Sequence, residues 1–320
     1  WKIIYKKGNF KGKIFGVIRG HFRRLRDIFR VSKYDIVYIF MWVTPFGSTL
    51  MERLFINLSN NIIFDLEDNL FQQVKLSKSY LRNPLLYIFK NLNKQKLLIK
   101  ESNYVITSSP ELEKICKRLN KYKKAVYITS SVNTDKFKPI PKLIKKKVVV
   151  GWTGTFSSKI YLESIESILL ELSNRVDYKL HIIGDFDYYL KGVDLEVSQW
   201  SLENEVDLMR SFDIGIYPLP MNNWVKGKSG LKAIQYMAFG IPTVATDIGN
   251  TPNIITNRSE GILVRSSDEW ILALEELIKN PKLREEMGKK AREKALQRYS
   301  LEAVSESYAN VLNYLKAKKQ

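Results

Sequence analysis

Lysines and glycines stand close together in the segment Lys226–Thr246, which reads KGKSGLKAIQYMAFGIPTVAT. Gly-Lys-Ser just before a helical pattern is typical of a P-loop, in which backbone N–H groups converge on a phosphate chain. A Walker P-loop requires another glycine at position 222, and this chain has Asn222 there. The segment therefore predicts a phosphate site of a different design.

The backbone N–H groups of Ser229, Gly230 and Leu231 fall at the start of the helix that LKAIQYMAFG predicts. The first N–H groups of a helix have no acceptor within the helix, so they can bind an anion. Lys228 lies just outside this turn, and Lys232 follows four residues later on the same face. This arrangement suits a diphosphate, but a surface loop with solvated lysines contains the same residue types.

Two further turns follow predicted strands. Gly154 and Thr155 end GWTGT after the strand KVVV, and Gly184 ends HIIG in the next strand. Small residues at a strand end let the backbone approach a ligand closely, and a helix that follows offers its N-terminus to an anion. Each turn taken alone is unspecific, because many such turns only connect a strand to a helix.

The elements around these turns alternate between short β-rich runs and longer amphipathic runs, which indicates parallel sheets with crossover helices. The simplest interpretation is two doubly wound domains joined by an exposed linker at 132–147, with ligands bound in the cleft between them. The predicted strands of the first half are 2–6, 35–41, 61–65, 103–108 and 125–129. Those of the second half are 147–155, 178–186, 193–200, 213–220, 241–246 and 260–265.

Composition excludes several classes of protein. The 320 residues are 45% hydrophobic and 27% charged, which is typical of a soluble globular protein. The apolar run 36–43 is far shorter than the roughly 20 residues that a membrane span needs. Cys116 is the single cysteine, so no intrachain disulfide forms, and a reducing cytoplasm is expected. We interpret Cys116 as ordinary packing.

The net charge of +19 is concentrated in the first half of the chain. Residues 1–147 contain 31 basic and 10 acidic side chains, a balance of +21, whereas residues 148–320 contain 21 and 23, a balance of −2. The first half should therefore face an anionic partner, either nucleic acid or a membrane surface. The segments 19–30 and 79–100 mix basic with apolar residues, which suits a membrane interface or an ordinary amphipathic core helix.

Several linked motifs in the second half resemble the nucleotide-sugar domain of family 4 retaining glycosyltransferases, of the bacterial surface-glycan type. They occur in the family's order and spacing over nearly all of residues 147–315. The motifs are Gly-x-Thr-Gly, HIIGDF, DLMRSFDIGIYPLP, GKSGLKAIQYMAFGIPTVATDIGNTPNII, EGILV and NPKLREEMGKKAREKALQRYSLEAVSESYANVL. The first half matches the family's acceptor domain more weakly, through YDIVYIF, IIFDLEDNLF, SNYVITSSPEL and AVYITSSVNTDKFKP.

The resemblance implies a GT-B fold, in which two Rossmann-like domains face a central cleft and the last helix crosses back onto the first domain. It implies an acceptor domain at 1–146, which lacks a recognisable first strand, a nucleotide-sugar domain at 147–300, and the crossing helix at 301–320. Residues upstream of Trp1, where no initiator Met stands, are expected to complete the first domain.

The same resemblance implies roles for individual residues. Gly154, Thr155 and Gly184 lie at the turns beside the donor's phosphate or sugar, and Trp200 borders the base. The N–H groups of Ser229, Gly230 and Leu231 bind the diphosphate. Lys228, with Lys159 or Lys232, neutralises the departing nucleoside diphosphate, work that a metal ion does elsewhere, so neither a metal nor a separate cofactor is expected.

One departure from the family pattern concerns two glutamates that bind the donor sugar and the ribose. Gly227 and Gln235 occupy these positions. The Gln235 amide can still hydrogen-bond a ribose, because it both donates and accepts, but Gly227 has no side chain. Either the donor contact differs, with Lys228 shifted into the gap, or activity is reduced or lost and the protein is a non-catalytic subunit.

Asp65 and Asp68 end a predicted strand in FDLEDNLF and are the candidates for holding an acceptor sugar. A structural cap or salt bridge explains the same residues, and metal ligation is a third interpretation that no histidine cluster supports. His21, in a basic helix, and His181, inside a strand, are both interpreted as buried or solvated side chains without catalytic roles.

The sequence thus predicts a retaining, metal-independent hexosyltransferase for cell-surface polysaccharide synthesis. The expected donor is a UDP- or GDP-linked sugar, and the expected acceptor is a glycan or an undecaprenyl-type lipid-linked sugar. We expect the protein in the cytoplasm, bound peripherally to the inner face of the plasma membrane through its basic half. The alternatives are a non-catalytic glycosyltransferase-like subunit and a basic nucleic-acid-binding protein, for which no recognition motif is evident.

Overall fold

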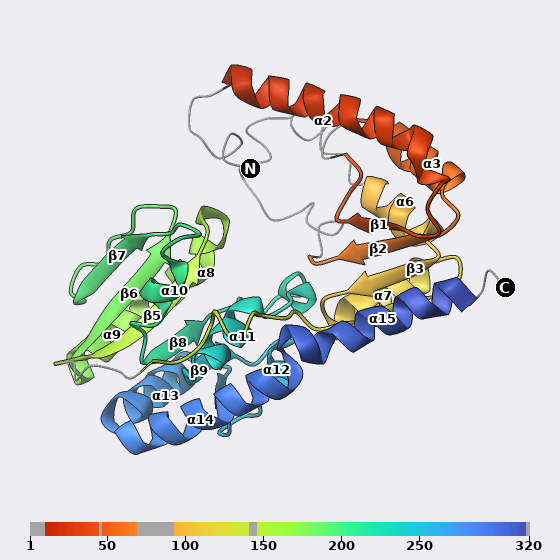
Figure 1. Ribbon diagram of the computed structural model, residues 1–320. Coiled ribbons are helices and arrows are strands. Elements are labelled where there is room, and N and C mark those ends of the chain that lie inside the picture. Colours follow the sequence, from red (N-terminus) through yellow and green to blue (C-terminus); the bar gives the residue numbers. More distant parts are fainter. Residues whose placement is uncertain (1–9, 45–46, 69–92, 141–145, 318–320) are drawn as a thin grey trace. The chain divides into compact units, whose positions relative to one another are not determined.

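The computed structural model describes residues 10–44, 47–68, 93–140 and 146–317 (Figure 1). The chain divides into two compact units. The first comprises residues 1–128 together with 307–320, and the second comprises residues 129–306. The expected strand at 2–6 and most of the basic segment 79–100 lie outside the described residues.

The described strands of the first unit form a parallel sheet in the order β1-β2-β3-β4. These strands are β1 (Val37–Phe40), β2 (Ile62–Leu66), β3 (Tyr104–Thr107) and β4 (Ala125–Tyr127). The helices are α2 (Phe10–Val31), α3 (Leu50–Leu58), α6 (Asn93–Glu101) and α7 (Pro110–Leu119). Consecutive helices from α2 to α7 pack on one another, and apolar side chains from these elements form one core.

Local sequence explains these elements. All five residues of β2 are buried, including four large apolar ones, which is typical of a strand inside a parallel sheet. Helix α7 begins after Ser109, whose side chain accepts the N–H of Leu112, and Pro110 occupies its first turn. Acidic residues lie in the first turn of α7 and basic residues in its last turn, so both ends complement the helix dipole.

The second unit contains a six-stranded parallel sheet in the order β10-β9-β8-β5-β6-β7. Its strands are β5 (Val148–Gly154), β6 (Tyr178–Gly184), β7 (Leu195–Gln199), β8 (Ile214–Tyr217), β9 (Thr243–Thr246) and β10 (Gly261–Val264). Its helices up to β9 are η2 (Phe156–Ser158), α8 (Lys159–Glu163), α9 (Glu166–Arg175), α10 (Glu205–Met209), η3 (Val225–Gly227) and α11 (Leu231–Ala238). After β9 come α12 (Thr251–Ile254), α13 (Ser267–Lys279), α14 (Pro281–Arg298) and the start of α15 (Leu301–Ala317).

The winding direction of this sheet reverses between β5 and β8. From β5 the chain steps outward through β6 to β7, and it then returns to β8 on the other side of β5. The two strands are paired only at Val150 with Ile214 and at Gly151 with Gly215. Beyond these pairs the carboxyl ends of β5 and β8 are not registered to each other, so a topological switch point lies here.

The boundary between the units differs from the predicted one. Residues 129–146 were expected in the first domain, but the described part of this segment belongs to the second unit. The N–H of Val132 donates to the carbonyl of Tyr299 at 2.8 Å, and Phe137 is buried in the core of the second unit. The guanidinium of Arg292 donates to the carbonyls of Thr134 and Phe137 at 3.0 and 2.9 Å. The described part of this Pro- and Lys-rich segment is therefore not an exposed linker, because its backbone forms hydrogen bonds with Tyr299 and Arg292 of the second unit.

Helix α15 belongs to both units, because residues from 307 onward are part of the first unit. Its last turns pack on the sheet of the first unit. The Tyr314 ring lies edge-on to Tyr104 with 5.6 Å between the centroids, and the Lys124 ammonium lies 4.9 Å from the centroid of the same ring. In the described ranges, no helix is long and apolar enough to cross a bilayer.

Replacing Arg292 by Ala should lower the free energy of unfolding by about 2 kcal/mol, because three carbonyls lose a charged donor. The third acceptor is the Ala238 carbonyl, 2.7 Å away. Limited proteolysis should also cleave the segment 129–146 faster than in the wild type. Arg298→Ala, at an exposed position on the same helix, is the control and should change neither result. Equal effects of both variants in urea unfolding would contradict this role of Arg292.

Candidate functional site

The carboxyl ends of β5 and β6 lie side by side at one end of the strands of the second sheet. Gly154 and Gly184, the last residues of the two strands, are registered partners. The N–H of Phe156 donates to the Asp185 carboxylate at 2.6 Å, and the N–H of Trp200 donates to the Gly184 carbonyl at 2.8 Å. Hydrogen bonds therefore join the three turns that follow β5, β6 and β7.

The turn after β5 is held by a reciprocal cap. The N–H of Thr155 donates to Ser158 Oγ at 3.0 Å, and the Ser158 hydroxyl donates back to the Thr155 carbonyl at 3.0 Å. A Cβ at Gly154 would lie 2.3 Å from the Trp152 ring and 2.5 Å from Ser158 Oγ. Only glycine fits at this strand end, so the backbone turns tightly beside the switch point.

The start of α11 is equally constrained. Gly230 has a left-handed backbone with φ of +81°, and a Cβ there would lie 2.2 Å from Ile254 Cδ1. Ser229 is buried, and its carbonyl accepts the Asn250 side-chain amide at 2.9 Å. Leu231 begins the helix directly after the glycine. The N–H groups at this end are therefore held in place where the helix dipole is positive.

Lys232 joins α11 to the turn after β5. Its ammonium donates to Ser158 Oγ at 3.3 Å and lies 4.7 Å from the centroid of a Trp152 ring. Lys228 is half-buried, and its ammonium lies 4.6 Å from a Trp224 ring centroid. Two lysines and a helix N-terminus thus occur together at the switch point, as expected for an anion site.

Lys159 has different neighbours. Its ammonium forms an ion pair with Glu163 at 3.3 Å and lies 5.7 and 5.8 Å from the ring centroids of Phe186 and Tyr188. Lys159 therefore lies over the turn that follows β6. The Trp200 indole N–H donates to Glu205 at 3.2 Å, so the ring is held on the far side of β6 from β5.

Gln235 and Gly227 lie on the same segment as the lysines. Gln235 is half-buried on α11, three residues after Lys232 and hence on a neighbouring part of the same helix face. Gly227 is buried at the end of η3 and precedes Lys228 directly. All the predicted donor-site residues thus lie in the second unit. Those of β5, η3 and α11 lie along the switch-point segments, whereas Gly184, Lys159 and Trp200 lie at the neighbouring ends of β6 and β7.

Asp65 and Asp68 belong to the first unit and form a second candidate site. Asp65 is buried near the end of β2, where it accepts a hydrogen bond from the Tyr38 hydroxyl of β1 and interacts likewise with Tyr308 of α15. Burial raises the pKa of Asp65, although the hydrogen bonds from both tyrosines oppose that shift. Burial and the charge of Asp65 raise the pKa of Tyr308 to about 12. Asp68 is half-buried beyond the strand end.

The remaining titratable candidates lie in structural positions. Cys116 is fully buried, and burial raises its pKa to about 12. His181 is buried in β6 between the hydroxyls of Ser211 and Ser198, at 2.8 and 2.9 Å. His21 bonds the Val17 carbonyl of its own helix at 2.9 Å. Among the described residues, no group of three His, Cys, Asp or Glu side chains is placed to hold a metal ion.

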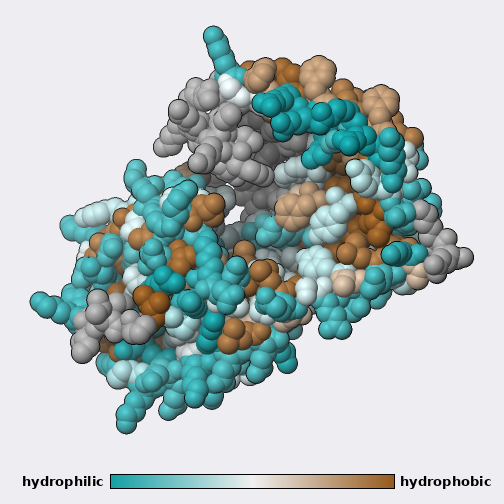
Figure 2. Space-filling view, viewed as in Figure 1, coloured by the Kyte–Doolittle hydropathy of each residue, from teal (hydrophilic) through white to brown (hydrophobic). Residues whose placement is uncertain are grey.

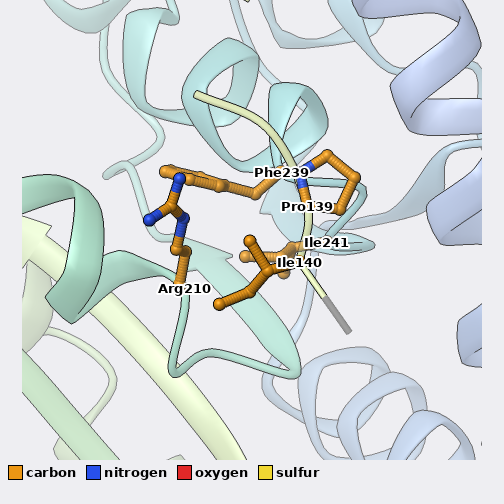
Figure 3. Close-up of a pocket in the computed structure, with 5 residues that line it drawn as sticks. All are labelled: Pro139, Ile140, Arg210, Phe239 and Ile241. Carbon is orange, nitrogen blue, oxygen red and sulfur yellow. The ribbon is translucent and has the colours of Figure 1, made fainter. Parts of the chain in front are cut away.

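A small pocket lies at the opposite ends of the strands of the second sheet (Figure 3). Pro139, Ile140, Arg210, Phe239 and Ile241 line it. Arg210 and Ile241 precede β8 and β9, so the pocket is at the amino ends of these strands. Because ligands of open parallel sheets bind at the carboxyl ends, this pocket is not the candidate site.

Several contacts of the site have no signal in the sequence. Asp185, Ser158 and Tyr236 hold the turn after β5, and Tyr38 and Tyr308 surround Asp65. Tyr308 is more than 240 positions away from Asp65 along the chain. Such partners are not found by spacing, because they depend on how the strands and helices pack.

Comparisons with known proteins identify the second half of the chain. Residues 147–280 match the model of the family Glycosyl transferases group 1, so this half carries such a domain. A curated relative, the N-acetyl-alpha-D-glucosaminyl L-malate synthase of Bacillus anthracis, is 24% identical over 157 residues. These residues are 47% of this chain and 41% of that enzyme, so the match spans less than half of the relative's length.

Solved structures with similar folds cover most of the chain. Sucrose-phosphate synthase from Thermosynechococcus elongatus has a TM-score of 0.68 at 16% identity, over 89% of this chain and 75% of that one. Anabaena HepE in complex with UDP-glucose has a TM-score of 0.67 at 14% identity, over 91% of this chain and 82% of that one. TarM of S. aureus has a TM-score of 0.66 at 17% identity, over 89% of this chain and 57% of that one. The predicted GT-B fold with two Rossmann-like parallel sheets is confirmed.

Replacing Gly230 by Ala should abolish anion binding at the start of α11, because an L residue resists this left-handed backbone and its Cβ overlaps Ile254. Isothermal titration with nucleoside diphosphates would measure the loss. Gly192→Ala is the matched control, since Gly192 also has a positive φ, of +90°, but precedes β7 at the other edge of the sheet. Both variants should melt at lower temperature, and only Gly230→Ala should lose binding. Loss in both would show a general effect of misfolding.

Proposed function

We propose that the protein is a retaining glycosyltransferase that moves a sugar from a nucleotide sugar to a glycan or lipid-linked acceptor in cell-surface polysaccharide synthesis. The observation that carries this proposal is the junction at the switch point. There the N-terminus of α11 and the turn after β5 are held together by Lys232 and Ser158. A helix start, a tight glycine turn and lysines in one place match the chemistry of a sugar-linked diphosphate.

In this proposal the donor diphosphate lies on the N–H groups of Ser229, Gly230 and Leu231. Lys228 and Lys232 neutralise the negative charge that develops on the leaving nucleoside diphosphate, and Lys159 assists from the neighbouring turn. These lysines take the part that a divalent cation plays in other transferases, so we propose that the reaction needs no metal. Gln235 hydrogen-bonds the ribose, and Lys228 binds the donor where Gly227 offers no side chain.

The proposed donor is linked to UDP or GDP. The HepE structures were solved with UDP, with UDP and glucose, and with UDP-glucose, which makes uridine the first base to test. The Trp200 ring, held by Glu205 beyond the end of β7, is our candidate to border the base. An aromatic ring of this kind offers a face for stacking on a nucleobase.

For the acceptor we propose the cluster around Asp65. A carboxylate and two tyrosine hydroxyls offer both acceptors and donors to sugar hydroxyls, and Asp68 lies close by at the end of the same strand. In the transfer step, the acceptor oxygen bonds to the anomeric carbon on the face from which the phosphate oxygen leaves. The departing phosphate takes the hydroxyl proton, so no side-chain base is required.

We further propose that helix α2 binds the protein peripherally to the inner face of an anionic plasma membrane. Its arginines lie beside exposed apolar side chains, and Figure 2 shows teal and brown residues side by side along this helix at the top of the view. The exposed apolar residues of α2 are Ile14, Phe15, Ile18, Phe22, Leu25 and Phe29. Arginine next to exposed phenylalanine is typical of helices that lie in a membrane interface.

Lys228→Ala should reduce kcat/KM for the transfer about 100-fold, because the leaving diphosphate loses a positive charge in the transition state. The assay first requires a thermal-shift panel of UDP-, GDP- and ADP-sugars with the free diphosphates, in which a bound ligand raises the melting temperature. Lys191→Ala, an exposed lysine before β7, is the control. Near-normal turnover of Lys228→Ala would refute its role, and no shift with any nucleotide would favour a non-catalytic subunit.

Replacing Phe22 and Phe29 by Glu should abolish sedimentation of the protein with vesicles that contain phosphatidylglycerol. The change removes two exposed rings, 67% and 81% accessible, and adds two negative charges. Leu272→Glu, at a 61% accessible position on α13, is the control and should still sediment. Wild-type protein that binds oligonucleotides but not these vesicles would instead favour the nucleic-acid alternative.

A further inference from the structure

The N–H of Thr153 lies beyond the last residue pair of β5 and β8, on the carboxyl-terminal part of β5. It donates instead to the hydroxyl of Tyr236, at 3.0 Å. Tyr236 comes from α11 and is fully buried. A side chain of the helix thus takes the place of a neighbouring strand at the point where the sheet divides, one residue before Gly154.

Two glycines make room for this contact. Gly151 and Gly215 are registered partners on β5 and β8. A Cβ at Gly215 would lie 2.5 Å from the Tyr236 ring, and one at Gly151 would lie 2.0 Å from the Phe212 ring. The rings of Phe212 and Tyr236 pack edge-on with 5.9 Å between centroids. The Tyr236 ring can therefore lie flat against β8 while its hydroxyl reaches β5.

Tyr236 links α11 to the end of β5. A further link is the hydrogen bond from Lys232 to Ser158, which lies on the opposite side of Gly154 and Thr155 along the chain. The same helix presents its N-terminus at Leu231, just over one helical turn before Tyr236. These hydrogen bonds of Tyr236 and Lys232 therefore fix the distance between the turn after β5 and the N-terminus of α11.

We propose that Tyr236 is a positioning residue for the donor site: its hydroxyl holds the β5 turn so that Gly154, Thr155 and the start of α11 reach one diphosphate together. This inference rests on the proposed function. The inference goes beyond that function because it assigns a role to a buried side chain that itself touches no substrate. Preorganised backbone donors bind an anion without the cost of ordering, so loss of this link should appear chiefly in donor affinity.

The test compares Tyr236→Phe with Tyr178→Phe. Both remove one hydroxyl from a buried tyrosine of the second unit. Tyr178 begins β6, and its hydroxyl donates to the Leu169 carbonyl at 2.7 Å, so it serves the other hydrophobic core of this unit, at the amino end of its strand. Both variants should lose a similar amount of thermal stability. Tyr236→Phe should weaken nucleoside diphosphate binding about tenfold in calorimetry and raise the donor KM similarly with kcat little changed, whereas Tyr178→Phe should bind as the wild type does.

Amide hydrogen exchange of the ligand-free variants gives a second readout. Peptides that cover 153–158 should exchange faster in Tyr236→Phe and at the wild-type rate in Tyr178→Phe. Wild-type binding by Tyr236→Phe, or equal loss in both variants, would overturn the positioning role. If the wild type binds no nucleoside diphosphate, the proposed function fails and the donor role with it, while the exchange result still decides whether Tyr236 fixes the turn.

Discussion

The divergence of β5 and β8 is the constraint on which the candidate site depends. A parallel sheet that winds outward in both directions must reverse at one pair of neighbouring strands, and here that pair is registered only through Val150 with Ile214 and Gly151 with Gly215. The freed backbone at the end of β5 needs a partner because it is buried, and the Tyr236 hydroxyl provides one. The separation of the two strand ends beside the start of α11 is thus a consequence of sheet topology.

Helix α11 connects the core of the second unit to the proposed donor site. Its buried face, with Ile234, Tyr236 and Met237, packs in the core, while its first turn presents N–H groups and Lys232 at the proposed donor site. Helix packing and the positive end of the dipole therefore lie on one rigid element. We expect a substitution on the buried face to change the geometry of the first turn, because eight residues leave little length over which a shift can be absorbed.

The candidate site of the first unit is built around a buried carboxylate and not around lysines. Asp65 is buried and lies among tyrosine hydroxyls, so its carboxylate interacts with neutral donors, and burial raises its pKa. Its partner Tyr308 comes from α15, the helix that returns to this unit from the second. The site around Asp65 is therefore complete only when the end of the chain has folded onto the sheet that the beginning forms.

The sequence by itself determined the parallel α/β class, the positions of the strands that the structure describes, the turns at Gly154 and Gly184 and the helix start at Gly230. Each of these depends on local pattern and on glycine geometry. It misplaced the segment 129–146, since proline and lysine content does not show that Arg292 binds carbonyls there. Tertiary structure alone decided the hydrogen bonds of Tyr236 with Thr153 and of Tyr308 with Asp65. These pairs are far apart along the chain, and only the packing of sheet and helix sets the distance between their atoms.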